Sequence, residues 1–113
     1  MDQTINVMSE SILQTISTLK VSEAKLTIGG AEISFENGAT LVIYNRFTLT
    51  GISPAEAKSL IGKTVSHIDD SPQAISIEFE KRIIIKIDMR DNAYTGPEAM
   101  ELSVPGEPVA IWN

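Results

Sequence analysis

The stretch AISIEFEKRIIIKIDMR, residues 74–90, alternates apolar and polar side chains on both sides of a charged loop. Alternation with a period of two is typical of strands that bury one face. The apolar positions are Ile75, Ile77 and Phe79 before the loop and Ile83, Ile85, Ile87 and Met89 after it. A three-residue loop over 80–82 keeps all of them on one face. The stretch therefore predicts an antiparallel β-hairpin.

A second alternating stretch, AEISFENGATLVI, occupies residues 31–43. Its loop contains Asn37-Gly38, a pair that readily supplies the positive φ angles of a tight turn. A two-residue turn would place Leu41 on the face opposite to Phe35, because side chains alternate along a strand. A three-residue loop over 36–38 keeps the apolar residues together. We therefore expect the three-residue loop, with Gly38 in the left-handed region.

The two hairpins align at a spacing of 44 residues. At this spacing the matched pairs are Val21 with Val65, Phe35 with Phe79, Leu41 with Ile85, Ile43 with Ile87 and Arg46 with Arg90. With one residue inserted, Thr50-Gly51 also matches Thr95-Gly96. We predict one domain over residues 1–113 with an internal repeat, about 21–57 and 65–99. Chance similarity between two amphipathic hairpins is the alternative.

Helical signals stand outside the hairpins. Residues 4–19 carry apolar side chains at steps of three and four, which predicts an amphipathic N-terminal helix. Ser53-Pro54-Ala55-Glu56 has the pattern of a capping box with proline at the first helical position, and Gly62 can end that short helix. Thr95 to Glu98 has similar cap chemistry and predicts one helical turn, while Val109 to Trp112 predicts a final edge strand.

These elements predict a mainly β fold of the α+β kind. We expect an antiparallel sheet arranged as a small sandwich or an open barrel, with the N-terminal helix covering part of it. The apolar stripe of that helix can instead pack on a second subunit, so a homodimer is an alternative arrangement. The chain is 42% apolar and has no cysteine, which excludes disulfides and thiolate chemistry.

Fifteen acidic and nine basic residues give a net charge of −6. This charge disfavours general nucleic-acid binding, which needs clustered Lys and Arg. It favours a basic protein partner, or it serves solubility alone. No apolar run approaches the roughly 20 residues that span a bilayer, and the N-terminus lacks the basic and apolar regions of a secretory signal. We expect a soluble, cytoplasmic protein that does not bind membranes.

Catalytic and metal-binding signals are weak. The one histidine, His67, could act as a base beside Asp69 or Asp70, but no nucleophile motif accompanies it. Neither Asp69-Asp70 nor the pair Asp88 and Asp91 has further oxygen ligands at the spacing of a calcium loop. We expect no metal, no cofactor and no enzymatic activity.

The binding candidates fall into two classes. In the first, a non-catalytic immunity- or inhibitor-type module neutralises a basic protein partner through outward acids. Its candidate residues are Glu78, Glu80, Asp88 and Asp91, with Trp112 as an apolar anchor on the final strand. The same tryptophan can instead close one end of the core.

In the second class, the matched pair Arg46 and Arg90 clamps a small anion such as a nucleotide, and Tyr44 and Tyr94 stack on it. The alternative for the two arginines is pairing with a neighbouring carboxylate such as Asp88 or Asp91, which would leave them no ligand-binding role.

The motifs LIGKTV at 60–65, I-x-I-x-F at 75–79, I-x-I at 85–87 and GPEA at 96–99, before a final Ile-Trp, form a recognisable set. With them the chain resembles a loose group of small, mostly uncharacterised bacterial proteins with two β units and a C-terminal aromatic residue. The resemblance covers residues 60–112 and implies the β fold. The group includes candidates for toxin-neutralising or accessory proteins, and no binding residue carries over from it. The loop at Lys81-Arg82 departs from the glycine-containing turn of the pattern.

Overall fold

The computed structural model describes residues 12–113. Of the predicted helix over 4–19, residues 4–11 lie outside the described part. Residues 12–14 are helical and residues 15–18 form turns. Thr18 has a φ of 69°, which is left-handed, so the helical stretch ends before Leu19.

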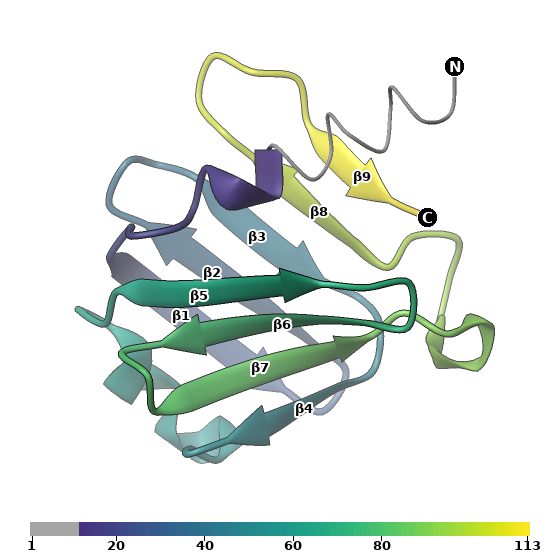
Figure 1. Ribbon diagram of the computed structural model, residues 1–113, viewed down its shortest axis with the longest axis horizontal. Coiled ribbons are helices and arrows are strands. Elements are labelled where there is room, and N and C mark those ends of the chain that lie inside the picture. Colours follow the sequence, from purple (N-terminus) through teal and green to yellow (C-terminus); the bar gives the residue numbers. More distant parts are fainter. Residues whose placement is uncertain (1–11) are drawn as a thin grey trace.

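Nine strands form two antiparallel sheets in the described part of the chain (Figure 1). The first sheet has the order β1-β2-β3-β8-β9 and the second the order β4-β7-β6-β5. The strands are β1 (Val21–Thr27), β2 (Gly30–Phe35), β3 (Thr40–Ile43), β4 (Phe47–Thr50), β5 (Val65–Asp70), β6 (Ala74–Phe79), β7 (Ile83–Asp88), β8 (Met100–Ser103) and β9 (Ala110–Trp112). Two 3₁₀ turns, η1 (Pro54–Leu60) and η2 (Asp91–Ala93), lie between strands. The arrangement is sandwich-like, as predicted.

The core lies between the two sheets, because each strand of a hairpin turns alternate side chains inward. Ile33 and Leu41 from the first sheet and Ile77 and Ile85 from the second are fully buried. Phe35 and Phe79 are the largest of the fully buried side chains. Burying a side chain of this kind contributes roughly 1.5–3 kcal/mol, so the alternation found in the sequence is what holds the two sheets together.

Both predicted hairpin registers are confirmed. Ile33 pairs with Leu41, and the amide of Phe35 donates to the carbonyl of Ala39 at 2.8 Å, across a three-residue loop in which Gly38 has a φ of 89°. Phe79 pairs with Ile83 across the loop 80–82. In that second loop two non-glycine residues, Glu80 and Lys81, have positive φ angles of 55° and 59°.

The strand before each hairpin carries an irregularity at the same relative position. Val21 pairs with Phe35 and Glu23 with Ser34, so the register shifts between Val21 and Glu23. In the other sheet Val65 pairs with Phe79 and His67 with Glu78, with the shift between Val65 and His67. A bulge of this kind breaks the inward–outward alternation of its strand.

Two connections carry the chain from one sheet to the other. β4 follows β3 directly in the chain but pairs with β7, and β8 follows β7 but pairs with β3. The two sheets also meet at an isolated antiparallel bridge between Lys20 and Thr64. The first sheet is therefore completed by β8 and β9 from the second half of the chain, and the second sheet by β4 from the first half.

The turn at Ser53 has the predicted capping box. The carboxylate of Glu56 accepts from the Ser53 amide at 2.9 Å and from its hydroxyl at 3.1 Å, and Pro54 occupies the first turn of η1. Gly62 follows with a φ of 88°.

The prediction of a helical turn at Thr95–Glu98 is wrong. The segment forms bends without helix, and the 3₁₀ turn η2 lies before it. Tertiary hydrogen bonds fix the chain directly after the segment, because the Ala99 carbonyl accepts from the Tyr44 and Asn45 amides and its own amide donates to Trp112. The match with Thr50-Gly51 is also not structural, since Gly51 directly follows β4 whereas Gly96 precedes β8.

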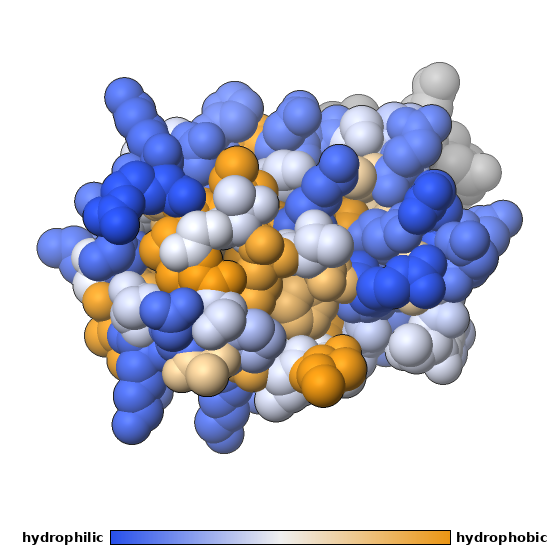
Figure 2. Space-filling model, turned by 90° about the horizontal axis from the view of Figure 1, so that it is seen from below, coloured by the Kyte–Doolittle hydropathy of each residue, from blue (hydrophilic) through white to orange (hydrophobic). Residues whose placement is uncertain are grey.

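The surface differs between the ends and the middle of the molecule. Seen from the side of β4 and η1, apolar surface lies between groups of hydrophilic side chains at both ends (Figure 2). The large apolar residues that are clearly exposed are Ile28, Ile61, Val109 and Ile111. Within residues 12–113 no helix is both long and apolar enough to span a bilayer.

Candidate functional site

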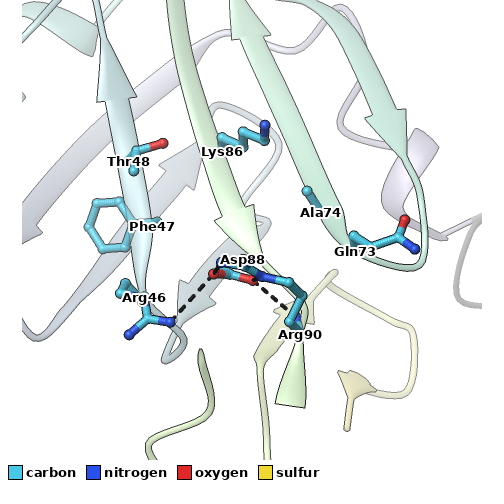
Figure 3. Close-up of a pocket in the computed structure, with 8 residues that line it drawn as sticks. All are labelled: Arg46, Phe47, Thr48, Gln73, Ala74, Lys86, Asp88 and Arg90. Carbon is cyan, nitrogen blue, oxygen red and sulfur yellow. Dashed lines mark hydrogen bonds and ion pairs between the residues drawn. The ribbon is translucent and has the colours of Figure 1, made fainter. Parts of the chain in front are cut away.

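A hollow of about 510 Å³ opens at one end of the four-stranded sheet, over β4, β7 and β6 (Figure 3). Its lining residues are Arg46, Phe47, Thr48, Gln73, Ala74, Lys86, Asp88 and Arg90. Three of these side chains are cationic and one is a carboxylate. The volume lies within the range of roughly 300–1,000 Å³ that is typical of small-molecule sites.

The carboxylate of Asp88 holds both arginines at the lower rim of the hollow. Arg90 bonds it in a forked manner, from Nε to Oδ1 at 3.0 Å and from a terminal nitrogen to Oδ2 at 2.7 Å, and its amide also donates to Oδ1 at 3.0 Å. Arg46 approaches Oδ2 at 3.5 Å (Figure 3). Hydrogen bonds from Arg90 lower the pKa of Asp88 well below its usual range, and the same pair raises the pKa of Arg90.

The structure therefore brings the two predicted arginines together, and it does so on an internal carboxylate. Both arginine side chains remain largely exposed, at 57% for Arg46 and 61% for Arg90. Ion pairs between exposed side chains contribute little to stability. The arrangement consequently fixes where the two arginines lie without burying their remaining N–H donors.

Lys86 supplies the third cation, two residues before Asp88 on the same outer face of β7. It lies directly opposite Thr48 on β4 and Ser76 on β6. Ala74 stands opposite Asp88, and its small side chain leaves open the space between Asp88 and Gln73. The hollow thus arises from a short side chain set among longer polar ones.

Buried main-chain and side-chain bonds hold the floor of the hollow in place. Asn45 is 1% exposed and donates from Nδ2 to the main-chain oxygen of Asp88 at 2.8 Å. The Asp88 amide donates to the Arg46 carbonyl at 3.0 Å, and the Met89 amide donates to the Gln73 carbonyl at 2.9 Å. These bonds join the ends of β4, β6 and β7 where the lining residues stand.

The two predicted tyrosines do not line the hollow. Tyr44 donates from its hydroxyl to Glu101 at 2.7 Å, in the other sheet. This bond, together with burial and the charge of Glu101, raises the pKa of Tyr44 to about 12. Tyr94 is half-buried, and burial and the nearby Asp91 raise its pKa. The structure therefore gives no support to stacking of either ring on a ligand bound in the hollow.

The predicted acidic residues fall into two separate groups. Glu78 and Glu80 lie near the loop of the β6–β7 hairpin, where Glu78 accepts from the Ser66 hydroxyl and Glu80 accepts from the Thr64 amide at 2.8 Å. The Thr64 amide bond also lowers the pKa of Glu80. Asp88 and Asp91 stand at the opposite end, and Asp88 is surrounded by cations. These four acids do not form one continuous surface.

Trp112 lies in the core with 9% of its surface exposed, on the inner face of β9 beside Ala110, as the core interpretation expected. Val109 and Ile111 point the other way and are 51% and 42% exposed. The tryptophan ring therefore packs in the core instead of offering a surface to a partner.

His67, Asp69 and Asp70 are all exposed on β5. Among residues 12–113 no three histidine or acidic side chains are grouped as a metal site would require.

Several residues of the hollow were missed from the sequence. Lys86 could have been found, because strict alternation along β7 places it on the same face as Asp88. Gln73 and Ala74 gave no signal, since only the pairing of β6 with β7 brings them beside Asp88.

Comparisons of the chain with known family models, curated proteins and solved structures found no match.

Proposed function

We propose that this chain is a non-catalytic binding protein whose hollow takes a small anionic ligand. The observation that carries the proposal is the lining itself, in which Arg46, Lys86 and Arg90 face one shared space with a single carboxylate, Asp88. The local charge is positive although the whole chain is acidic. Such a site attracts an anion that the rest of the surface repels.

The polar neighbours and the fixed floor support the same proposal. Thr48 and Gln73 add neutral hydrogen-bonding groups, and Ala74 adds apolar lining. The ring of Phe47 lies on the inner side of β4, where it packs against the core. Because the buried bonds of Asn45 and Arg46 hold the strand ends in register, less conformational freedom is lost when a ligand binds.

Thermal unfolding in the presence of candidate anions tests this function. At constant ionic strength, a ligand at 100 times its Kd should stabilise the protein by about 2.7 kcal/mol. Arg46→Met and Lys86→Met should reduce that stabilisation, since methionine keeps an apolar stem and removes the charge. Lys25→Met is the matched control, because Lys25 is exposed on the other sheet. Equal stabilisation of all three variants would reject the site.

A second candidate function is the immunity- or inhibitor-type module that neutralises a basic protein. The outer face of the five-stranded sheet favours it. Across this face, Glu32 of β2 and Glu101 of β8 lie on either side of Val42 of β3. The exposed Ile111 of β9 lies next to Glu101 on the neighbouring strand. Acidic residues beside an exposed apolar edge suit a basic partner. Of the four acids that the sequence predicts for this role, Glu78 and Glu80 form the competing surface on the β6–β7 hairpin, while Asp88 is paired with arginines and Asp91 lies at the opposite end.

Native mass spectrometry of the protein purified from its host separates these surfaces. If the outer face of the five-stranded sheet binds a protein, Glu32→Lys should remove the added mass and Glu78→Lys should retain it. The reverse pattern would assign the partner to the β6–β7 hairpin. The same spectrum reports a homodimer, and fractionation of the host cells tests the predicted cytoplasmic location.

We also propose that the domain consists of two copies of one unit, with the hollow where they meet. Pairings separated by 44 residues support this. The pair Val21 and Phe35 corresponds to the pair Val65 and Phe79. The pair Ile33 and Leu41 corresponds in the same way to Ile77 and Ile85. The isolated bridge joins Lys20 to Thr64, the residue 44 positions later. Two inter-unit bonds match as well: the Thr18 amide donates to Val65 at 3.0 Å, and the Gly62 amide donates to Val21 at 2.8 Å.

In this proposal the two units exchange strands. The amide of Tyr44 donates to Ala99, and the amide of Asp88 donates to Arg46, so β8 beside β3 and β4 beside β7 occupy corresponding positions. A protease site placed between Ile52 and Ser53 tests the exchange, because cleavage there leaves β4 in the sheet of the other half. The cleaved protein should remain one particle with one unfolding transition. Separation of the two pieces in native buffer would contradict the proposal.

A further inference from the structure

We infer that the ligand of the hollow is an organic phosphate monoester, bound as a dianion with its apolar group against the lining of β6 and β7. This inference depends on the proposed anion site and names the ligand class for it. Three features of the hollow carry it: its charge, the directions of its donors, and its remaining space.

The first feature is charge balance. Arg46, Lys86 and Arg90 carry three positive charges, and Asp88 carries one negative charge. Asp88 stays ionised because Arg90 holds its carboxylate in a fork. Two positive charges are then left without a counter-charge in the lining. A dianion balances them, whereas a monoanion leaves one unbalanced and gains about half of the electrostatic attraction.

The second feature is the direction of the free donors. A planar carboxylate ligand binds best to the forked side of a guanidinium group. On Arg90 that side is already occupied by Asp88, at 3.0 and 2.7 Å. The remaining donors come from separate side chains on different strands, with Arg46 before β4 and Lys86 on β7 (Figure 3). A phosphate group offers three oxygens in a tetrahedral arrangement, one more than a carboxylate, and so can accept from donors on separate side chains in more directions.

The third feature is the space beside the cations. A hollow of about 510 Å³ is larger than a bare phosphate ion needs. Ala74 keeps this space open because its side chain is the smallest in the lining, and the aliphatic stem of Lys86 adds apolar surface at the β7 side. An apolar or aromatic group attached to the phosphate would remove that surface from water. We therefore expect an ester and not inorganic phosphate.

Calorimetric titration of the full-length protein with ring-matched probes tests the inference. At pH 8 and constant ionic strength the probes are phenyl phosphate, phthalate, benzoate and inorganic phosphate. Phenyl phosphate should bind at least about tenfold more tightly than each of the other three, which corresponds to about 1.4 kcal/mol. Near pH 5 phenyl phosphate loses its second charge, since the second pKa of a phosphate ester is about 6, and its advantage over benzoate should shrink.

Two variants tie the result to the hollow. Lys86→Met should weaken phenyl phosphate binding by about tenfold or more, and Ala74→Leu should abolish it by filling the space without removing a charge. Lys25→Met should leave the affinity for phenyl phosphate unchanged. A variant that loses its cooperative thermal transition is replaced by the milder Ala74→Val or Lys86→Gln.

The outcomes separate this inference from the function on which it depends. If benzoate or phthalate binds as tightly as phenyl phosphate, the site is a general anion site and the phosphate inference is overturned. If inorganic phosphate binds as tightly as phenyl phosphate, the ester part is overturned. If no probe binds below about 10 mM in a manner that depends on Lys86, both the inference and the anion-binding function fail.

Discussion

The buried side chain of Asn45 donates a hydrogen bond from Nδ2 to the main-chain oxygen of Asp88 at 2.8 Å. Asn45 is 1% exposed, and among residues 12–113 its Oδ1 meets no hydrogen-bond partner. The residue is the one polar side chain in an otherwise apolar set of buried residues of the described chain. It therefore connects the start of β4 to the end of β7, beneath the carboxylate that orients both arginines.

Replacing Asn45 with Ala should destabilise the protein by about 1–3 kcal/mol, because the Asp88 carbonyl loses its donor in a buried place. Chemical denaturation measures this change. Asn92→Ala is the matched control, since Asn92 is exposed, and it should stay within about 0.5 kcal/mol of the parent. A loss below that limit for Asn45→Ala would mean that the buried bond does not hold β7 in place.

Local pattern was sufficient for the hairpins and insufficient for the strands before them. The alternation of Ile75 to Phe79 and of Ile83 to Ile87 gives both strands of the hairpin and its inner face. In β1 and β5 a bulge follows the first residue, so Val21 is succeeded by two exposed residues before Ala24, and the period of two is lost. A bulge is set by the pairing partner, which a single segment does not reveal.

Residues of the candidate site could be predicted only where the sequence matches itself at 44 residues or where apolar and polar residues alternate along a strand. Arg46 and Arg90 were found because they match at 44 residues, and their convergence on Asp88 follows from the pairing of β4 with β7. The prediction of a helical turn at Thr95–Glu98 failed for the opposite reason. Its cap chemistry is local, whereas the backbone bonds of Ala99 to Trp112, Tyr44 and Asn45 are long-range and fix the chain directly after the segment.

The hydroxyl of Tyr44 should titrate well above the ordinary range for tyrosine. Its bond to Glu101 is the main cause of a pKa raised from 10 to about 12. Because the pKa of Tyr44 is higher in the folded state than in the unfolded state, the protonated hydroxyl contributes to the stability of the fold. That contribution is complete below about pH 10 and is lost as the pH rises toward 12. In Tyr94→Phe, Tyr44 is the remaining tyrosine of the chain, so tyrosinate absorbance follows it alone.

In that background, Glu101→Gln should move the titration midpoint down toward 10, because the charge that opposes ionisation is removed. Glu107→Gln provides the comparison, since Glu107 is exposed in the β8–β9 connection. The bond between Tyr44 and Glu101 would be refuted if both variants titrated alike.

Lys81 has a φ of 59°, a left-handed conformation that is unfavourable for a residue with a Cβ. Lys81→Gly should therefore stabilise the protein by up to about 1 kcal/mol, as the relief of strain exceeds the added freedom of the unfolded chain. The Lys81 amide can keep its bond to Ser66, which uses only the main chain of residue 81. Arg82→Gly, next to it and without a positive φ, should have the opposite sign in urea unfolding. Destabilisation of similar size by both changes would show that strain at Lys81 is unimportant.

Gly51 and Gly62 share nearly the same backbone conformation and differ in what surrounds them. Their φ angles are 91° and 88°, so an alanine at either position adopts the same unfavourable left-handed geometry. At Gly51 the new Cβ would also lie 2.6 Å from the Arg82 carbonyl oxygen, whereas at Gly62 nothing lies within 4 Å. Gly62→Ala should therefore cost only the conformational strain, about 1–2 kcal/mol.

Gly51→Ala should cost the same strain plus a steric term of about 1–3 kcal/mol, because the obstacle is main chain that carries β7. Urea denaturation of the two variants side by side measures the difference. A larger loss for Gly51→Ala would establish the close approach of the β4 end to the 80–82 loop, and with it the position of β4 at the edge of the second sheet. Equal losses would mean that the loop moves away freely, and that Gly51 is kept for its backbone angle alone.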